Sequence, residues 1–249
     1  MSQVPAATRA LRVLRFLAAQ PEPVAVDRIA RELGIPRSTT YHLLQAMAAE
    51  GFVVHLADDR RFGLGVAAFE VGSGYARQAP LQRIARRPLA ALVDRTGHSA
   101  HLAVPHGRDV LYVLEERAPG RPSLVTDVGV RLPSHLTASG RAILAHLPAS
   151  QVRALYPDRE AFVDRTGVGP GSPTALRAVL AETRRRGHAI EDGEVTAGLA
   201  SVAAAVLDHN GLPVAGVAIT YPVDEAEPER LAAAVVATAA TLSRRLHGR

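Results

Sequence analysis

Two short amphipathic segments that meet at Gly34-Ile35-Pro36 constrain the fold of this chain more than any other feature. The first runs from about Asp27, a candidate N-cap, to Leu33, and Gly34 is the residue type that most readily closes a helix in the left-handed conformation. Pro36 suits the first turn of the next helix, which continues to about Glu50. The spacing predicts a helix, a tight turn and a second helix.

The flanking segments complete a small domain around this pair. Residues 8–19 repeat apolar side chains every three or four positions, which predicts a helix that ends at the prolines of 21–23. After the pair, apolar residues alternate on both sides of a polar turn, which is typical of a β-hairpin (Phe52, Val54, Leu56, then Phe62 and Leu64). Three helices and a hairpin predict a winged unit, with Arg60 and Arg61 at the tip of the hairpin.

The helix that begins near Pro36 has polar residues where a helix entering the DNA major groove needs them. An inward stripe of Thr40, Leu43, Leu44 and Met47 places Ser38, Tyr41, His42 and Gln45 on or near the outward face. Arg37, Ser38 and Thr39 stand at the N-terminus, where small hydroxyls and free N–H groups can approach phosphates and base edges. Arg37 and Gln45 are residue types that form bidentate contacts to guanine and adenine. A solvated helix with an ordinary Ser/Thr start is the alternative.

The charge distribution favours the DNA-binding interpretation. All 29 basic residues are arginine, and residues 1–87 hold 12 of them against 7 acidic residues, whereas residues 88–249 hold 17 of each. The whole formal excess of +5 therefore lies in the first third, where a polyanionic partner is expected to bind. Arg9, on the first helix, belongs to this basic region.

The remaining chain predicts a mixed α/β (α+β) domain. Residues 99–116 read as two strands around a turn at 106–108, and residues 200–207 and 213–221 as two strands around Asn210-Gly211. Helices are expected at 137–147, 150–156, 173–187 with Ser172 as N-cap, and 224–246. Residues 67–80, softened by Gly72 and Gly74, read as a partly helical linker between the winged unit at 1–66 and a second domain at 81–249.

The helix start at Thr137-Ala138-Ser139-Gly140 is a candidate site for a small carboxylate. Its hydroxyls and unpaired N–H groups can accept an anion, although a plain Ser/Thr helix cap is the alternative. Ser201 and Thr220 are polar residues on otherwise apolar strands, so they face either a ligand or buried water, or they are satisfied core hydroxyls.

Enzyme and metal sites are the weaker alternatives. The chain has no cysteine, and His98 and His101 would point to opposite faces of a strand, so we predict no metal and no cofactor. No Gly-x-Ser-x-Gly elbow frames Ser139, and no acidic partner can be named for the nearby His135. A small-molecule hydrolase, or a sensor module whose winged unit binds protein instead of DNA, remains the alternative function. No apolar run approaches the roughly 18 residues of a membrane span, and a cytoplasmic location is expected.

The order and spacing of six segments resemble the IclR family of transcriptional regulators. These are "RALRVLRFLA", "LGIPRSTTYHLLQAMAAEGFV", "RRFGLG", "RTGHSAHLAV", "HLTASGRAILA" and "GLASVAAAVLDHNGLPVAGVAIT". The resemblance implies an N-terminal winged helix-turn-helix, a helical linker and a GAF-like α/β effector-binding domain. It also implies a homodimer or homotetramer on a palindromic operator in double-stranded DNA, and favours a repressor.

The resemblance also implies which residues contact an effector. Ala138, Ser139, Glu191, Ser201, Ala218 and Thr220 match effector-contacting positions of the family. This chain departs from the common pattern at three positions, with His42 in place of Arg, Leu136 in place of Ala and Arg141 in place of Lys. We therefore expect a DNA-binding regulator, not an enzyme, whose operator binding is modulated by a small metabolite.

Overall fold

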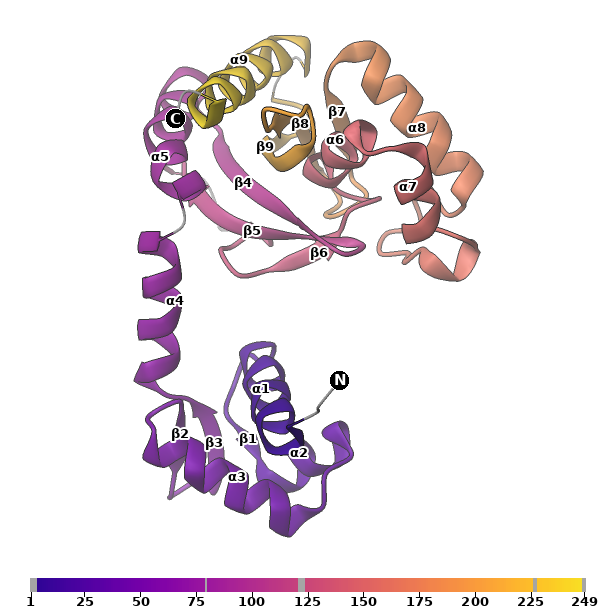
Figure 1. Ribbon diagram of the computed structural model, residues 1–249. Helices are drawn as coiled ribbons and strands as arrows, with labels where there is room; N and C mark the ends of the chain where they lie inside the picture. The colour runs from indigo at the N-terminus through magenta and orange to yellow at the C-terminus, as the bar shows by residue number, and fades with distance from the viewer. Residues whose placement is uncertain (1–3, 79, 121–123, 226–227, 248–249) are drawn as a thin grey trace. The chain divides into compact units, whose positions relative to one another are not determined.

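The computed structural model describes residues 4–78, 80–120, 124–225 and 228–247 (Figure 1). The chain divides into two compact units, Met1–Ala79 and Pro80–Arg249. Among the described residues, no helix combines the length and the apolar character that crossing a membrane would require.

The first unit packs helices against a small antiparallel sheet. Its elements are α1 (Pro5–Ala18), β1 (Val24–Ala25), α2 (Val26–Leu33), α3 (Arg37–Ala49), β2 (Val53–Leu56), β3 (Arg61–Leu64) and α4 (Val66–Gln78). The sheet has the order β1-β3-β2. The core joins helices α1 to α3 to one face of this sheet through apolar side chains (Val13, Leu17, Val24, Ile29, Leu44, Met47, Val53 and Phe62). The predicted winged unit is confirmed, with β1 as a strand that the sequence did not predict.

The turn between α2 and α3 follows the predicted chemistry. Gly34 ends α2 in the left-handed conformation with φ +64°, and the N–H of the buried Ile35 donates to the Ala30 carbonyl at 3.0 Å. The Thr40 hydroxyl donates to the Pro36 carbonyl at 3.1 Å, which ties the first turn of α3 to the turn before it. Asp27 is not the N-cap of α2: Ala25 holds that position, and Asp27 lies in the first turn.

On β2, the residue that faces the core is not one of those that the alternating apolar pattern predicted. Val53 is buried, whereas Val54 and Leu56 are exposed. The register pairs His55 with Phe62, and the two rings stack with centroids 4.5 Å apart. His55 itself is exposed, so Val53 is the buried residue of β2, and the imidazole of His55 covers the buried Phe62.

The segment expected as a partly helical linker forms one continuous helix. Helix α4 runs from Val66 to Gln78 through Gly72 and Gly74. Glycine in a helix interior costs about 1 kcal/mol relative to alanine, which good helix formers such as Ala67 and Ala68 can offset.

The second unit is built on a six-stranded antiparallel sheet with the order β6-β5-β4-β9-β8-β7. Its strands are β4 (Ser99–His106), β5 (Asp109–Glu116), β6 (Arg131–Pro133), β7 (Ala189–Asp192), β8 (Leu199–Leu207) and β9 (Pro213–Pro222). Its helices are α5 (Pro80–Thr96), α6 (Ala138–His146), α7 (Ala149–Leu155), a short 3₁₀ turn (Arg159–Ala161), α8 (Pro173–Arg186) and α9 (Pro228–His247). The sequence predicted the two long hairpins but not β6 and β7, and α9 begins at Pro228 instead of Asp224.

The two faces of this sheet carry different partners. Helices α5 and α9 lie side by side on one face (Figure 1), where Arg245 donates to the Ile84 carbonyl and Arg95 to the Thr238 hydroxyl. Alternate strand residues such as Val217, Ile219 and Tyr221 fill the core beneath them. Helix α6 covers the other face, where small side chains let it approach closely (Ala189, Ala203 and Ala218).

Close approach is greatest where α6 crosses β9. A Cβ atom on Gly216 would lie 2.8 Å from the Ser139 carbonyl oxygen, closer than van der Waals contact allows. The lack of a side chain at Gly216 therefore holds the first turn of α6 directly against the sheet.

Candidate functional site

A groove in the first unit lies between α3 and the hairpin. Its lining includes five of the residues predicted to contact DNA, together with apolar and imidazole side chains (Val26, Arg37, Ser38, Tyr41, His42, His55, Ala57, Arg60 and Phe62). Tyr41 is 43% exposed although its ring is largely apolar, so its side chain is available to a ligand. Arg60 adopts φ +53° at the hairpin tip, a backbone conformation that is uncommon outside glycine.

The start of α3 is open to a phosphate group. Pro36 occupies the N-cap position and no side chain there accepts a hydrogen bond from the helix. The N–H groups of the first turn of a helix carry partial positive charge and attract anions when no side chain covers them. Arg37 and Ser38 are exposed beside them, whereas Thr39 is half-buried.

An exposed ion pair orients Arg37. Its Nε lies 2.7 Å from Oδ1 of Asp27, and both side chains are largely exposed. An exposed pair of this kind contributes about 0 to 1 kcal/mol, so a phosphate or a guanine edge can compete for the guanidinium.

The other predicted DNA contacts lie outside this groove. Gln45 is exposed two turns further along α3, and Arg9 is exposed on α1. Arg61 is partly committed, because its guanidinium donates to the Pro23 carbonyl at 3.4 Å and lies 3.8 Å from Glu22.

The second unit has a cavity between α6, the sheet face on which α6 packs, and two loops. The empty space is about 410 Å³, counting the part open to solvent. Seven of the eight residues predicted to contact an effector line it (Thr137, Ala138, Ser139, Glu191, Ser201, Ala218 and Thr220). Gly140 does not, because it packs against Ser134, whose Cα would lie 2.3 Å from an added Cβ.

At the N-terminus of α6, the two predicted hydroxyls have different roles. The Thr137 hydroxyl caps the helix by accepting the Gly140 N–H at 3.1 Å, so this N–H is already satisfied. Ser139 is 1% exposed, and its Oγ makes no well-formed hydrogen bond among the described residues, although the Tyr112 phenol lies close enough to interact with it. A buried hydroxyl without a partner is costly, and a ligand that accepts its hydrogen bond would remove that cost.

A row of polar side chains crosses three neighbouring strands at the cavity wall. The register places Glu191 opposite Ser201 and Ser201 opposite Thr220. The Ser201 and Thr220 hydroxyls lie 3.0 Å apart and hydrogen bond to each other. The two hydroxyls therefore satisfy one another, and because they also line the cavity, their contact with a ligand stays a prediction.

Glu191 is the acidic residue of this row. It is 3% exposed, and its Oε1 accepts the Val195 N–H at 3.0 Å. Burial raises the pKa of Glu191 to about 7, because a carboxylate removed from water loses most of its solvation.

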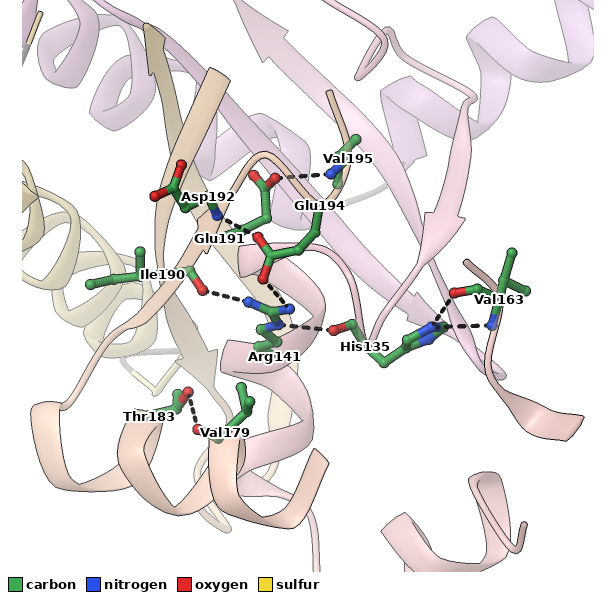
Figure 2. A network of polar contacts seen from close by, with 10 residues as sticks. All are labelled: His135, Arg141, Val163, Val179, Thr183, Ile190, Glu191, Asp192, Glu194 and Val195. Carbon is green, nitrogen blue, oxygen red and sulfur yellow. Dashed lines mark hydrogen bonds and ion pairs between the residues drawn. The ribbon is translucent and has the colours of Figure 1, made fainter. Parts of the chain in front are cut away.

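Arg141 on α6 links three segments next to the cavity (Figure 2). Its Nε donates to the His135 carbonyl, its Nη1 to the Ile190 carbonyl and its Nη2 to Glu194 Oε1, each at 2.8 Å. Glu194 also accepts the Asp192 N–H, so the loop after β7 is held at two points. The forked guanidinium reaches all three acceptors at once, which the single ammonium of a lysine would not do with the same geometry.

Sequence reasoning missed several lining residues. Tyr112 on β5 is buried in the cavity wall, and burial raises the pKa of its phenol. Thr126 lies in the loop before β6, and Val195, Thr196 and Leu199 follow β7. The sequence could have revealed Tyr112, because it is a polar residue at an alternate position of a predicted strand. The loop residues follow no pattern that would mark them as lining a cavity.

In the part of the chain that the structure describes, the histidines considered for catalysis or metal binding have other surroundings. His135 contacts the backbone of Val163 through Nε2 and packs against Tyr156 and Phe162, away from Ser139. His101 faces Thr126 and Tyr112, whereas His98 lies near Tyr221 in the opposite core. Among the described residues, no cluster of three or more His, Asp or Glu side chains could hold a metal ion.

Comparison with known proteins gives the same division of the chain. Residues 6–57 match the IclR helix-turn-helix domain and residues 73–244 match the family described as bacterial transcriptional regulator IclR C-terminal. The chain is 31% identical over 231 residues to the transcriptional repressor IclR of Escherichia coli (strain K12), a match that covers 92% of this chain and 84% of that protein.

Solved structures of regulators have the same fold. The IclR transcriptional regulator from Alicyclobacillus acidocaldarius is 25% identical with a TM-score of 0.87, and the match covers 98% of this chain and 100% of that one. An IclR homolog from Microbacterium hydrocarbonoxydans, solved in complex with 4-hydroxybenzoate, is 23% identical with a TM-score of 0.81 over 98% and 100% of the two chains.

The matches to both domains cover most of the chain, and the arrangement of winged unit and covered sheet agrees with them. The resemblance seen in the sequence is confirmed, and the function is that of a transcriptional regulator and not of an enzyme. The chain belongs to the IclR family of bacterial transcriptional regulators.

Proposed function

We propose that residues 1–66 bind an operator half-site with α3 in the major groove and the hairpin beside it. The exposed face of α3 and the hairpin supply the contacts, together with α1 (Arg9, Pro36, Arg37, Ser38, Thr39, Tyr41, His42, Gln45, Arg60 and Arg61). The open N-terminus of α3 and the groove between Arg37 and Arg60 support this assignment. Arg37 and Gln45 read bases, and Arg60 and Arg61 hold the phosphate backbone.

The cavity of the second unit binds a small carboxylate that modulates operator binding. The buried Ser139 at the N-terminus of α6, whose hydroxyl makes no well-formed hydrogen bond among the described residues, is the observation that carries this proposal. The lining, largely apolar with a few convergent polar groups, suits a small organic acid. The complex of the Microbacterium homolog with 4-hydroxybenzoate supports the same class of ligand. Residues 67–80, within and just after α4, connect this sensing domain at 81–249 to the DNA-binding domain.

The protein acts as a repressor and as a homodimer or homotetramer on a palindromic operator in the bacterial cytoplasm. The name of the E. coli relative supports repression. Exposed apolar side chains on α4 support self-association, because Val66, Phe69 and Val71 are 73%, 76% and 61% exposed. Two-fold pairing of protomers implies two half-sites related by the same symmetry.

Binding of the purified protein to a duplex from its own promoter region tests this function. Fluorescence anisotropy at several salt concentrations should give a Kd that weakens steeply with salt, with a linear dependence of log K on log salt. A scrambled duplex of equal length is the control. Equal affinity for both duplexes at every salt concentration would contradict operator recognition, and binding that does not depend on salt would contradict phosphate contact.

A further inference from the structure

The cavity wall of the second unit has an acidic group without a cationic counterpart. Among the described residues that line it, Glu191 is the carboxylic acid, Tyr112 is the other ionisable group, and none is basic. The nearby Arg141 donates to His135, Ile190 and Glu194, so its charge is shared with Glu194 and favours the ionised form of Glu191 less than burial opposes it. A carboxylate in this space would therefore meet a second carboxyl group with no basic side chain in the cavity wall.

The surroundings of Glu191 favour its neutral form. Its neighbours in and just after β7 are the acidic Asp192 and Glu194, and Tyr112 on β5 is an uncharged phenol in the same cavity wall. Ser201 on β8 stands opposite it, and this hydroxyl and the Val195 N–H favour the ionised form less than burial opposes it. Burial already raises the pKa of Glu191 to about 7, so at neutral pH the protonated and ionised forms are both present.

The opposite end of the cavity offers hydrogen-bond donors to an anion. Ser139 Oγ is buried and makes no well-formed hydrogen bond among the described residues, and it stands in the first turn of the nine-residue helix α6. An anion held there lies in the same cavity as Glu191. Two like charges in one cavity of low dielectric repel, and the repulsion is removed when one of them takes up a proton.

We propose that Glu191 is a specificity-determining residue that meets an anionic effector as the neutral acid, so that each bound anion brings one proton into the cavity. The inference rests on the proposed carboxylate-binding function. The protonated Glu191 presents an O–H donor to the ligand, and the Val195 N–H remains on its other oxygen. The cavity then selects acids with a single carboxylate, since a second one would face the ionisable group again.

Linkage fixes the direction of the pH dependence. Above about pH 7 the free Glu191 is mostly ionised, so binding an anion must draw a proton from solution. The affinity should then fall about tenfold for each pH unit between about pH 7.5 and 9. An uncharged ligand should show no such decrease.

Calorimetry on the full chain measures the proton directly. Acetate, lactate and 4-hydroxybenzoate are screened by thermal shift at pH 6, and each binder is titrated at pH 8 in phosphate and in Tris, which differ in heat of ionisation. The wild type should take up about 0.5 to 1 proton per bound anion. Glu191→Gln should bind the same anion with no uptake and with an affinity that does not change from pH 7 to 9.

Two controls separate the possible outcomes. Ser139→Ala should weaken binding but keep the uptake, and 4-hydroxybenzamide should bind without uptake. An anion that binds the wild type without a proton, or uptake that persists in Glu191→Gln, would overturn this inference and leave carboxylate binding in place. If none of the three acids binds the wild type or Glu191→Gln at pH 6, the carboxylate-binding function itself fails, and this inference fails with it.

Discussion

Arg141 Nη2 donates to Glu194 Oε1 at 2.8 Å, with side chains only 4% and 13% exposed. The pair joins helix α6 to the loop that follows β7 (Figure 2). Because that loop continues into Val195 and Thr196 of the cavity wall, the pair fixes one side of the cavity relative to the other.

Replacement of Arg141 should destabilise the second unit in a graded way. Arg141→Met leaves Glu194 buried without its partner, which costs about 3 to 5 kcal/mol. Arg141→Lys keeps the charge but cannot reach all three acceptors, and we expect a loss of about 1 to 3 kcal/mol. Urea unfolding measures the free energy of unfolding of both variants. If the methionine variant does not fold, the lysine variant alone tests whether the three hydrogen bonds of Arg141 are stabilising. Free energies of unfolding within about 0.5 kcal/mol of the wild type would show that the fork is not stabilising.

Operator preference should depend on Arg37 and Gln45. The double variant Arg37→Ala with Gln45→Ala removes two groups suited to base contacts, each worth about 1 to 3 kcal/mol of discrimination. The Kd for the promoter duplex should rise to that for a scrambled duplex, while circular dichroism and size-exclusion chromatography remain unchanged. Asp27→Ala is the matched control, because it removes the exposed partner of Arg37 and retains the guanidinium. An unchanged footprint of the double variant would remove α3 from the interface.

The effector response should depend on the space between Ser139 and Thr220. Ser139→Leu with Thr220→Leu fills the cavity with apolar volume, so operator binding should persist while its response to a bound acid is lost. Thr241→Leu makes the same kind of change at a half-buried position on α9 that does not line the cavity, and should leave the response intact. Anisotropy titrations with and without the acid compare the three proteins. A response that survives in the double variant would place the effector elsewhere.

The free energy of unfolding should depend on pH because Glu191 ionises at a higher pH in the folded protein than in the unfolded chain. An unfolded glutamate releases its proton near pH 4.5, whereas the folded protein holds it to about pH 7. Wild-type stability should therefore decrease by about 2 to 3 kcal/mol as pH rises through this window, relative to Glu191→Gln, which cannot ionise. Urea unfolding at pH 4.5, 6 and 8 measures the difference between the two proteins. A difference that is constant across the three pH values would mean that Glu191 ionises normally in the fold.

Local chemistry accounts for the elements that the sequence predicted. Gly34 and Pro36 fix the turn between α2 and α3, the Ser172 side chain caps α8 as expected, and Thr137 caps α6, as in the alternative of a plain helix cap. The hairpin around Asn210-Gly211 forms with Gly211 at φ +77°. Each of these signals lies within a few residues of the structure that it determines, which is why a single sequence reveals it.

The features that were missed depend on partners distant in sequence. Strands β6 and β7 are only three and four residues long, and they exist because β5 and β8 offer edges to pair with. Val53 and not Val54 points inward, because β3 sets the register that brings His55 onto Phe62. The fork of Arg141 could not be predicted either, since its acceptors lie 6, 49 and 53 residues away.

Strand β9 serves two environments with successive residues. Thr220 borders the cavity, whereas Ile219 and Tyr221 lie in the core beneath α5 and α9. Consecutive Cα atoms are about 3.8 Å apart, so any molecule that displaces Thr220 also displaces the side chains that support the two helices behind the sheet. A ligand in the cavity should therefore alter the opposite face of the sheet directly, through the single layer of strand β9 and with no loop in between.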